Sequence, residues 1–223
     1  MRWVEYPDRT QLYQGLTKVL AEGLGAAIKA RGHASFSVPG GTTPGPVFDL
    51  LSQMPLDWAK VAVFLNDERW VGEDSPRSNT RLLRARFLCG PAAKAKLVPL
   101  YAPSAQPEDQ LAALANGLAP HLPISVLLLG MGTDMHTASL FPGADLLTWA
   151  LAADAPPLMA LRAEAAGEPR ITLTAQVLQA ADTIHILITG TEKRAAIERA
   201  RDLPPEQAPI RAVLDNATVH WAE

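Results

Sequence analysis

His136 is the residue of this 223-residue chain whose type and position best suit proton transfer. It follows the glycine-rich segment 130–135, which comes directly after the apolar run 124–129. An imidazole titrates near neutral pH and can remove a proton from water, and Asp134 could orient its ring. A lone histidine is more often structural, but this setting favours a functional role. Ser139 lacks a Gly-x-Ser-x-Gly elbow, so we do not expect a Ser–His–Asp triad.

Charged side chains follow a second apolar run, at residues 61–65. Asp67 could act as an acid or base, and Arg69 could bind an anion or stabilise developing negative charge. Alternatively, Arg69 forms only an internal ion pair with Asp67 or Glu68. The residue types leave both interpretations open.

The turn 39–44 has the composition of an anion-binding turn. Gly40 and Gly41 let the backbone approach a ligand closely, Thr42 adds a hydroxyl donor, and a helix is expected to begin near Pro44. A plain strand-to-helix turn would look similar, and no Gly-Lys-Ser/Thr follows to make a P-loop. Two later cations, Arg170 and Lys193, could add charge to a phosphate bound here or could be surface residues.

Strand-like and helix-like segments alternate along the chain, which predicts an α/β protein with a mostly parallel sheet between helical layers. We expect one domain over 1–223. Strands are predicted at 34–38, 61–65, 124–129, 158–162, 171–174 and 183–189, with an edge strand at 217–221. Helices are predicted at 8–30, from Pro44, from Ser78-Asn79 through Phe87, at 107–119 and at 192–201. In a parallel sheet, the segments 39–44, 66–69 and 130–136 then converge on one edge, which predicts a ligand site there.

Composition narrows the expected partners. The net charge is −3 and there is no basic block, which argues against nucleic-acid binding. The arginines at 77, 81, 84 and 86 have helical spacing, which is typical of a solvated face. No apolar run has the roughly 20 residues of a membrane span, and the N-terminus is not a signal peptide. We therefore expect a cytoplasmic protein without membrane partners, as a monomer or weak homo-oligomer.

Several motifs together give the chain a resemblance to the 6-phosphogluconolactonases of the glucosamine-6-phosphate isomerase/6-phosphogluconolactonase family. These are Thr42-Thr43-Pro44 after two glycines, Asp67-Glu68-Arg69, Ser78-Asn79, the run 134–143, Pro169-Arg170-Ile171-Thr172-Leu173 and Gly190-x-x-Lys193. The resemblance implies a Rossmann-like three-layer α/β/α fold that uses no metal or cofactor. It also implies hydrolysis of 6-phospho-D-glucono-1,5-lactone, the second step of the oxidative pentose phosphate pathway.

The resemblance also implies residue roles. His136 is then the general base that activates water, Arg69, Arg170 and Lys193 match cationic positions, and Gly40, Gly41 and Thr42 match the phosphate turn. Met135 stands where the family usually has glycine, so a positive φ there would be strained. Pro39 stands where serine is common.

The alternative is a glucosamine-6-phosphate deaminase-type isomerase with Asp67 as the base. Arg69 in place of the tyrosine usual in those enzymes speaks against it. So does Thr-Ala-Ser-Leu-Phe-Pro at 137–142, which lacks the acid of their Ile-Ala-Phe-Asn-Glu-Pro motif.

Overall fold

Seven parallel strands form the central sheet of the computed structural model, which describes residues 1–223 apart from the side chain of Ala165. From one edge to the other they are β1 (Arg2–Glu5), β10 (Ala217–Ala222), β9 (Ile184–Thr189), β6 (Val126–Leu129), β2 (Ala34–Val38), β3 (Val61–Leu65) and β5 (Lys96–Leu97). Every residue of β2, β3 and β6 is buried. This is the pattern of parallel strands that are covered on both faces.

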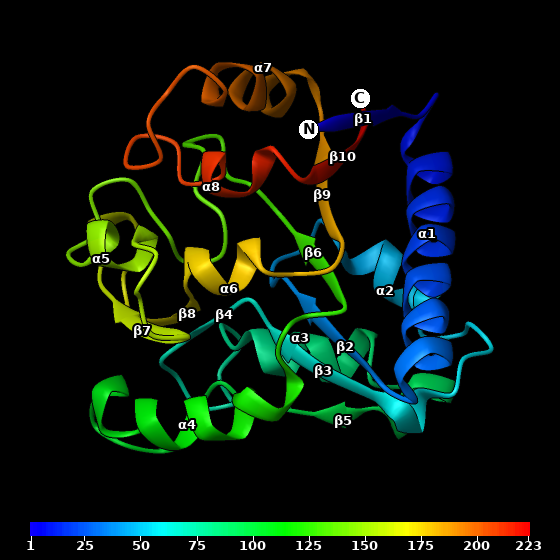
Figure 1. Ribbon diagram of the computed structural model, residues 1–223, viewed down its shortest axis with the longest axis horizontal. Coiled ribbons are helices and arrows are strands. Elements are labelled where there is room, and N and C mark those ends of the chain that lie inside the picture. The colour runs from blue at the N-terminus through cyan, green and yellow to red at the C-terminus, as the bar shows by residue number, and fades with distance from the viewer.

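Helices cover both faces of this sheet, so the predicted three-layer α/β arrangement is confirmed. In Figure 1, α1 and α2 lie on one side of the strands, and α6 and α8 lie on the other. The α-helices are α1 (Arg9–Arg31), α2 (Gly45–Leu51), α3 (Asn79–Arg86), α4 (Leu111–Leu118), α5 (Leu147–Leu151), α6 (Ala175–Gln179), α7 (Thr191–Ala200) and α8 (Arg211–Leu214). Short 3-10 helices span Trp58–Lys60, Gly90–Lys94, Pro107–Asp109, Ala119–His121 and Glu164–Ala166.

The ends of α1 show why the sequence predicts this helix closely. The Asp8 side chain accepts a hydrogen bond from the backbone N–H of Gln11, and Gly32 ends the helix with φ 78°. A short polar side chain at the start and a glycine in the left-handed region at the end satisfy backbone groups that a helix leaves unpaired. Leu12, Leu16 and Leu20 form the buried face.

A second, three-stranded antiparallel sheet lies beside the first and was not predicted. It consists of β4 (Asp67–Arg69), β8 (Arg170–Leu173) and β7 (Leu158–Leu161). The predicted strands at 158–162 and 171–174 are confirmed as β7 and β8, whereas the charged triplet at 67–69, placed by the sequence directly after a strand, is itself a strand. Pairing with β8 gives this triplet its backbone partners, with Arg69 opposite Arg170.

Asn66 joins the two sheets. Its side-chain Oδ1 accepts from the Ser37 hydroxyl at 2.6 Å, and its Nδ2 donates to the Leu128 carbonyl at 2.8 Å. Its backbone N–H donates to Val38, and its carbonyl accepts from Leu173 of β8. The side chain is fully buried, so one residue ties β2, β6 and β8 together at the point where the chain leaves β3.

The segment 217–221 is a strand as predicted, but the prediction that it lies at the edge of the sheet is wrong. This segment is β10, which lies inside the sheet between β9 and β1. The true edge, β1, has only four residues, and exposed charged residues stand at both of its ends. Such a segment carries little of the apolar signal by which a strand is recognised.

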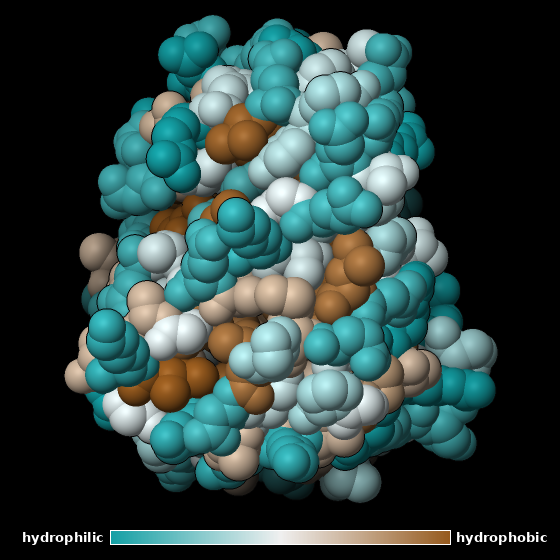
Figure 2. Space-filling model, turned by 90° about the vertical axis from the view of Figure 1, so that its right-hand side faces the viewer, coloured by the Kyte–Doolittle hydropathy of each residue, from teal (hydrophilic) through white to brown (hydrophobic). Residues whose placement is uncertain are grey.

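The surface is mainly hydrophilic on the side shown in Figure 2, with separate smaller hydrophobic areas. Among the described residues, no helix is both long and apolar enough to span a membrane. The arginines predicted to form a solvated face are largely engaged in ion pairs. These are Arg77 with Glu168, Arg84 with Glu73 and Arg86 with Asp49.

Two histidines whose sequence context is unremarkable form a buried polar chain with Tyr6. His185 Nδ1 lies 3.1 Å from His220 Nε2, and the Tyr6 hydroxyl lies 3.0 Å from His220 Nδ1. Burial, together with a smaller effect of nearby positive charge, lowers the pKa of His185 to about 4 and that of His220 to about 3. Both imidazoles are therefore neutral in the folded protein at neutral pH.

This histidine pair predicts a specific acid sensitivity. In the unfolded chain each histidine takes up a proton near pH 6.5, whereas the folded protein resists protonation until pH 3–4. The unfolded state therefore binds more protons below pH 6.5, and stability falls as the pH drops, by about 1.4 kcal/mol per pH unit for each histidine.

Urea denaturation between pH 7 and pH 5 measures this loss. The double variant His185→Gln/His220→Gln should show a shallower pH dependence than the wild type. Parallel pH dependences in the two proteins would contradict the prediction.

Candidate active site

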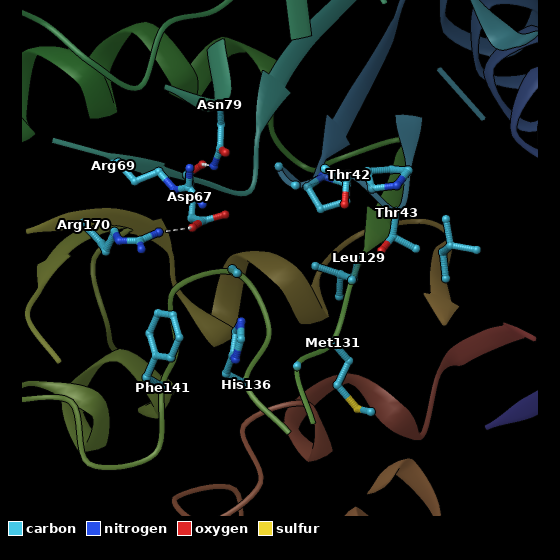
Figure 3. Close-up of a pocket in the computed structure, with 18 of the residues that line it drawn as sticks. Thr42, Thr43, Asp67, Arg69, Asn79, Leu129, Met131, His136, Phe141 and Arg170 are labelled. Atoms are coloured by element: carbon cyan, nitrogen blue, oxygen red, sulfur yellow. Dashed lines mark hydrogen bonds and ion pairs between the residues drawn. The ribbon is translucent and has the colours of Figure 1, made fainter. Parts of the chain in front are cut away.

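A cavity of about 460 Å³ opens at the carboxyl ends of the central strands. Three segments that were predicted to converge line it together: the turn 39–44, the β4 strand and the loop 130–138. Figure 3 shows their side chains pointing toward a common space. Eight of the nine residues proposed from the sequence line this cavity: Gly40, Gly41, Thr42, Asp67, Arg69, His136, Arg170 and Lys193. The ninth, Asp134, stands behind His136.

His136 and Asp134 form a hydrogen-bonded pair. Asp134 Oδ1 lies 2.6 Å from His136 Nδ1 and also accepts from the His136 backbone N–H at 3.3 Å. Because Nδ1 is engaged, Nε2 is the nitrogen left to act on a ligand. Phe141 stacks on the imidazole with ring centroids 4.2 Å apart.

Gly132 allows this pair to pack against the backbone. A Cβ atom at this position would lie 2.3 Å from both Asp134 Oδ1 and His136 Nδ1. A side chain at this position would push the pair out of place, because non-bonded contacts of carbon atoms are about 3.5–4.0 Å. Glycine at position 132 therefore has a direct steric cause.

Met135 adopts the backbone conformation that favours glycine, with φ 66°. Its N–H donates to the Gly132 carbonyl at 3.0 Å, and its carbonyl accepts from Ile210 at 3.1 Å. Its half-buried side chain packs against the core. The loop thus keeps its turn without the usual glycine, at a cost of about 1–2 kcal/mol for a left-handed residue with a Cβ.

Asp67 and Arg170 are buried side by side. Asp67 Oδ2 accepts a hydrogen bond from the Ser139 hydroxyl at 2.5 Å and lies 3.7 Å from Arg170 Nη1. Burial lowers the pKa of the Arg170 guanidinium, and the Asp67 charge beside it raises it in part. Arg170 Nη2 donates to the Ala166 carbonyl, while its buried Nε has no partner among the described residues. The Ser139 hydroxyl therefore donates to Asp67 and is not paired with His136.

Arg69 makes no ion pair with Asp67 or Glu68 within the described part of the chain. The alternative prediction, that Arg69 forms only an internal ion pair, is therefore wrong. Its Nη1 donates instead to the Arg77 carbonyl at 2.5 Å, and its buried Nε is unpartnered. Arg69 thus lines the cavity without a neutralising carboxylate. A cation in this state can interact with an incoming anion.

Glu68 has a structural role that the sequence does not predict. Its fully buried carboxylate accepts five hydrogen bonds at 2.7–3.2 Å. The donors are the backbone N–H groups of Arg69, Asn79 and Thr80 and the hydroxyls of Ser78 and Thr80. Acidic residues are rarely fully buried, so only the downstream Ser78-Asn79-Thr80 cluster at a helix start could have suggested this role.

The turn 39–44 meets two further polar groups at the cavity. Gly41 has φ 82°, and Asn79 packs directly against Gly40. Lys193, in the first turn of α7, is half-buried. Its pKa is lowered by burial, and the negative charges of Glu192 and Asp134 offset this effect only in part. Residues 1–223 as described contain no group of three or more histidine, cysteine or acidic side chains arranged to hold a metal ion.

Comparison with known proteins places the chain in a defined group. The family model described as "Glucosamine-6-phosphate isomerases/6-phosphogluconolactonase" matches residues 7–221. A 6-phosphogluconolactonase from Mesorhizobium japonicum is 44% identical, with 99% of this chain and 94% of that protein covered. A 6-phosphogluconolactonase from Rhizobium meliloti is 41% identical, with 97% of each covered.

Solved structures give the same result. A 6-phosphogluconolactonase from Shewanella baltica superposes with a TM-score of 0.96 at 34% identity, covering 100% of this chain and 98% of that one. A monomeric glucosamine-6-phosphate deaminase superposes with a TM-score of 0.82 at 17% identity, covering 99% and 97%. The second likeness concerns the fold alone.

The strain at Met135 can be measured with a pair of substitutions. Met135→Gly should be more stable than Met135→Ala by about 1 kcal/mol, because both remove the side chain and only alanine keeps the Cβ penalty at positive φ. At the exposed helical residue Lys18 the order should reverse by about 1 kcal/mol. Urea denaturation of the four variants tests this, and a more stable Met135→Ala would contradict the strain.

The buried carboxylate of Glu68 gives a second stability test. Glu68→Gln should lower the free energy of unfolding by about 3 kcal/mol, because an amide N–H₂ would face backbone donors. The matched control is Glu22→Gln on the exposed face of α1, which should change stability by less than about 0.5 kcal/mol. Equal, small effects of both substitutions on thermal unfolding would show that the Glu68 charge is dispensable.

Proposed function

Because the chain belongs to the family of glucosamine-6-phosphate isomerases and 6-phosphogluconolactonases, we propose that it hydrolyses 6-phospho-D-glucono-1,5-lactone to 6-phospho-D-gluconate. This is the reaction that the motifs of the sequence predict. The observation that supports it within the site is the His136–Asp134 pair at a cavity that also holds cations. We further propose that residues 1–223 act as one cytoplasmic catalytic domain.

In the proposed mechanism, His136 is the general base. Its Nε2 takes a proton from water as the water oxygen bonds to C1 of the lactone. Asp134 holds the ring through Nδ1 and stabilises the imidazolium that forms. The C1–ring-oxygen bond then breaks, and the imidazolium returns the proton to the departing ring oxygen. The product acid ionises and releases one proton to the solvent.

In this proposal, cations and backbone N–H groups bind the substrate at its C1 carbonyl and at its phosphate. Arg69, which no described carboxylate neutralises, stabilises the negative charge that develops on the carbonyl oxygen of C1. The turn of Gly40, Gly41 and Thr42 holds the phosphate together with Arg170 and Lys193. Binding energy from the remote phosphate then positions C1 for attack.

Asp67 is better placed to support this reaction than to act as an isomerase base. Its carboxylate accepts from Ser139 and lies beside Arg170, so it keeps that guanidinium oriented toward the cavity. Deaminase-type chemistry would instead need Asp67 to move a proton between C1 and C2 of the sugar. Ammonia release from glucosamine 6-phosphate is the result that would favour that alternative.

His136→Ala should lower kcat for lactone hydrolysis by about 10²–10⁴-fold, because the variant loses its general base. Initial rates are measured in a pH-stat with freshly prepared lactone, after the spontaneous rate is subtracted. Since the base is an imidazole, activity should survive a chelating agent.

The matched control is His33→Ala, at an exposed histidine remote from the cavity, which should retain full activity. Near-normal hydrolysis by folded His136→Ala would contradict the assignment of the base. Absence of hydrolysis by the wild type would contradict the proposed function itself.

A further inference from the structure

Asn79 is held at the cavity wall by contacts that leave part of its side chain unused. It is the first residue of α3, and its backbone N–H donates to Glu68 Oε1 at 2.9 Å. Ser78 caps the same helix by accepting from the Arg81 N–H. The start of α3 is therefore fixed on a buried carboxylate, and Asn79 is fixed with it.

The Asn79 carboxamide has a defined orientation. Its Nδ2 donates to the Asp67 backbone carbonyl at 3.2 Å, and a carbonyl can accept only from the N–H₂ end of an amide. The carboxamide also lies against Gly40, where an added Cβ would come within 2.1 Å of the Asn79 Oδ1. The hydrogen bond sets which end of the amide faces Asp67, and the contact with Gly40 places the group against the turn 39–44.

This orientation leaves the Asn79 carboxamide oxygen at the cavity. Only 4% of the residue is exposed, yet it lines the cavity with Asp67, Gly40 and Thr42. No described residue donates a hydrogen bond to Oδ1. Figure 3 shows Asn79 next to Asp67, across the space from His136.

A free amide oxygen can interact only with a ligand group that donates a hydrogen bond. It accepts hydrogen bonds but cannot donate them, and at neutral pH a phosphate is predominantly an acceptor. The lactone carbonyl also lacks a donor. The ring hydroxyls at C2, C3 and C4 are the groups of the substrate that can donate.

We propose that Asn79 Oδ1 accepts a hydrogen bond from one ring hydroxyl of the substrate, which makes Asn79 a specificity-determining residue. This rests on the proposed lactone hydrolysis. A lactone without that hydroxyl leaves a nearly buried acceptor unsatisfied, which costs binding and transition-state stabilisation. Asn79 thus recognises a ring hydroxyl of the sugar, whereas other residues of the site bind the phosphate.

The test compares Asn79→Ala with the wild type on the parent lactone and on its 2-, 3- and 4-deoxy analogues. For the wild type, kcat/KM should fall about tenfold with one analogue, and Asn79→Ala should lose about tenfold on the parent lactone. The two losses should not multiply: the variant should hydrolyse the parent and that analogue equally well.

Ser78→Ala is the matched control, since it removes the adjacent helix cap and does not line the cavity. It should lower thermal stability and leave the ranking of the four lactones unchanged. If Asn79→Ala folds poorly, Asn79→Ser, which also removes the carboxamide oxygen, provides the same comparison.

Equal loss by the Asn79 variant on all four lactones would overturn the proposal and leave Asn79 with a structural role. This outcome differs from a failure of the proposed function, in which the wild type would hydrolyse none of the lactones.

Discussion

The buried carboxylate of Glu68 is the interaction on which the geometry of the cavity depends. It binds the first turn of α3 to β4, and β4 in turn pairs with the strand that carries Arg170. A buried charge is tolerable only when it is fully hydrogen-bonded, and five donors meet that condition here. The polar wall of the cavity is therefore assembled around a group that never contacts its contents.

The main sheet and its helices were predictable because local signals agree with the tertiary structure. Continuous apolar runs became β3 and β6, the short segment 34–38 became β2, and Asp8 and Gly32 mark the ends of α1. The convergence of their following loops then followed from parallel topology alone. The small sheet was not predictable in this way, because β4 consists of three charged residues whose strand conformation depends on a partner about a hundred positions away.

The candidate site shows the same division. Residue type and a glycine-rich setting pointed to His136, and the family motifs pointed to the cations. Nothing in the local sequence indicated that Ser139 would pair with Asp67, or that Asn79 would lie against Gly40. Such contacts depend on how separate elements meet in space. Met135 is a different case. The family motif predicted a positive φ at this position, and the protein has that φ although methionine, unlike glycine, is strained there.

Asn66 has a consequence for how a substrate can enter. Its hydrogen bonds reach β2, β6 and β8 from a fully buried position, so the two sheets are joined directly beside Asp67, which lines the cavity. The opposing walls cannot part like two hinged lobes without breaking these bonds. Admission and release must then depend on the turn 39–44, the loop 130–138 and the side chains around the opening. The cavity is thus a cleft whose walls keep their spacing, and not the gap between two lobes that close on each other.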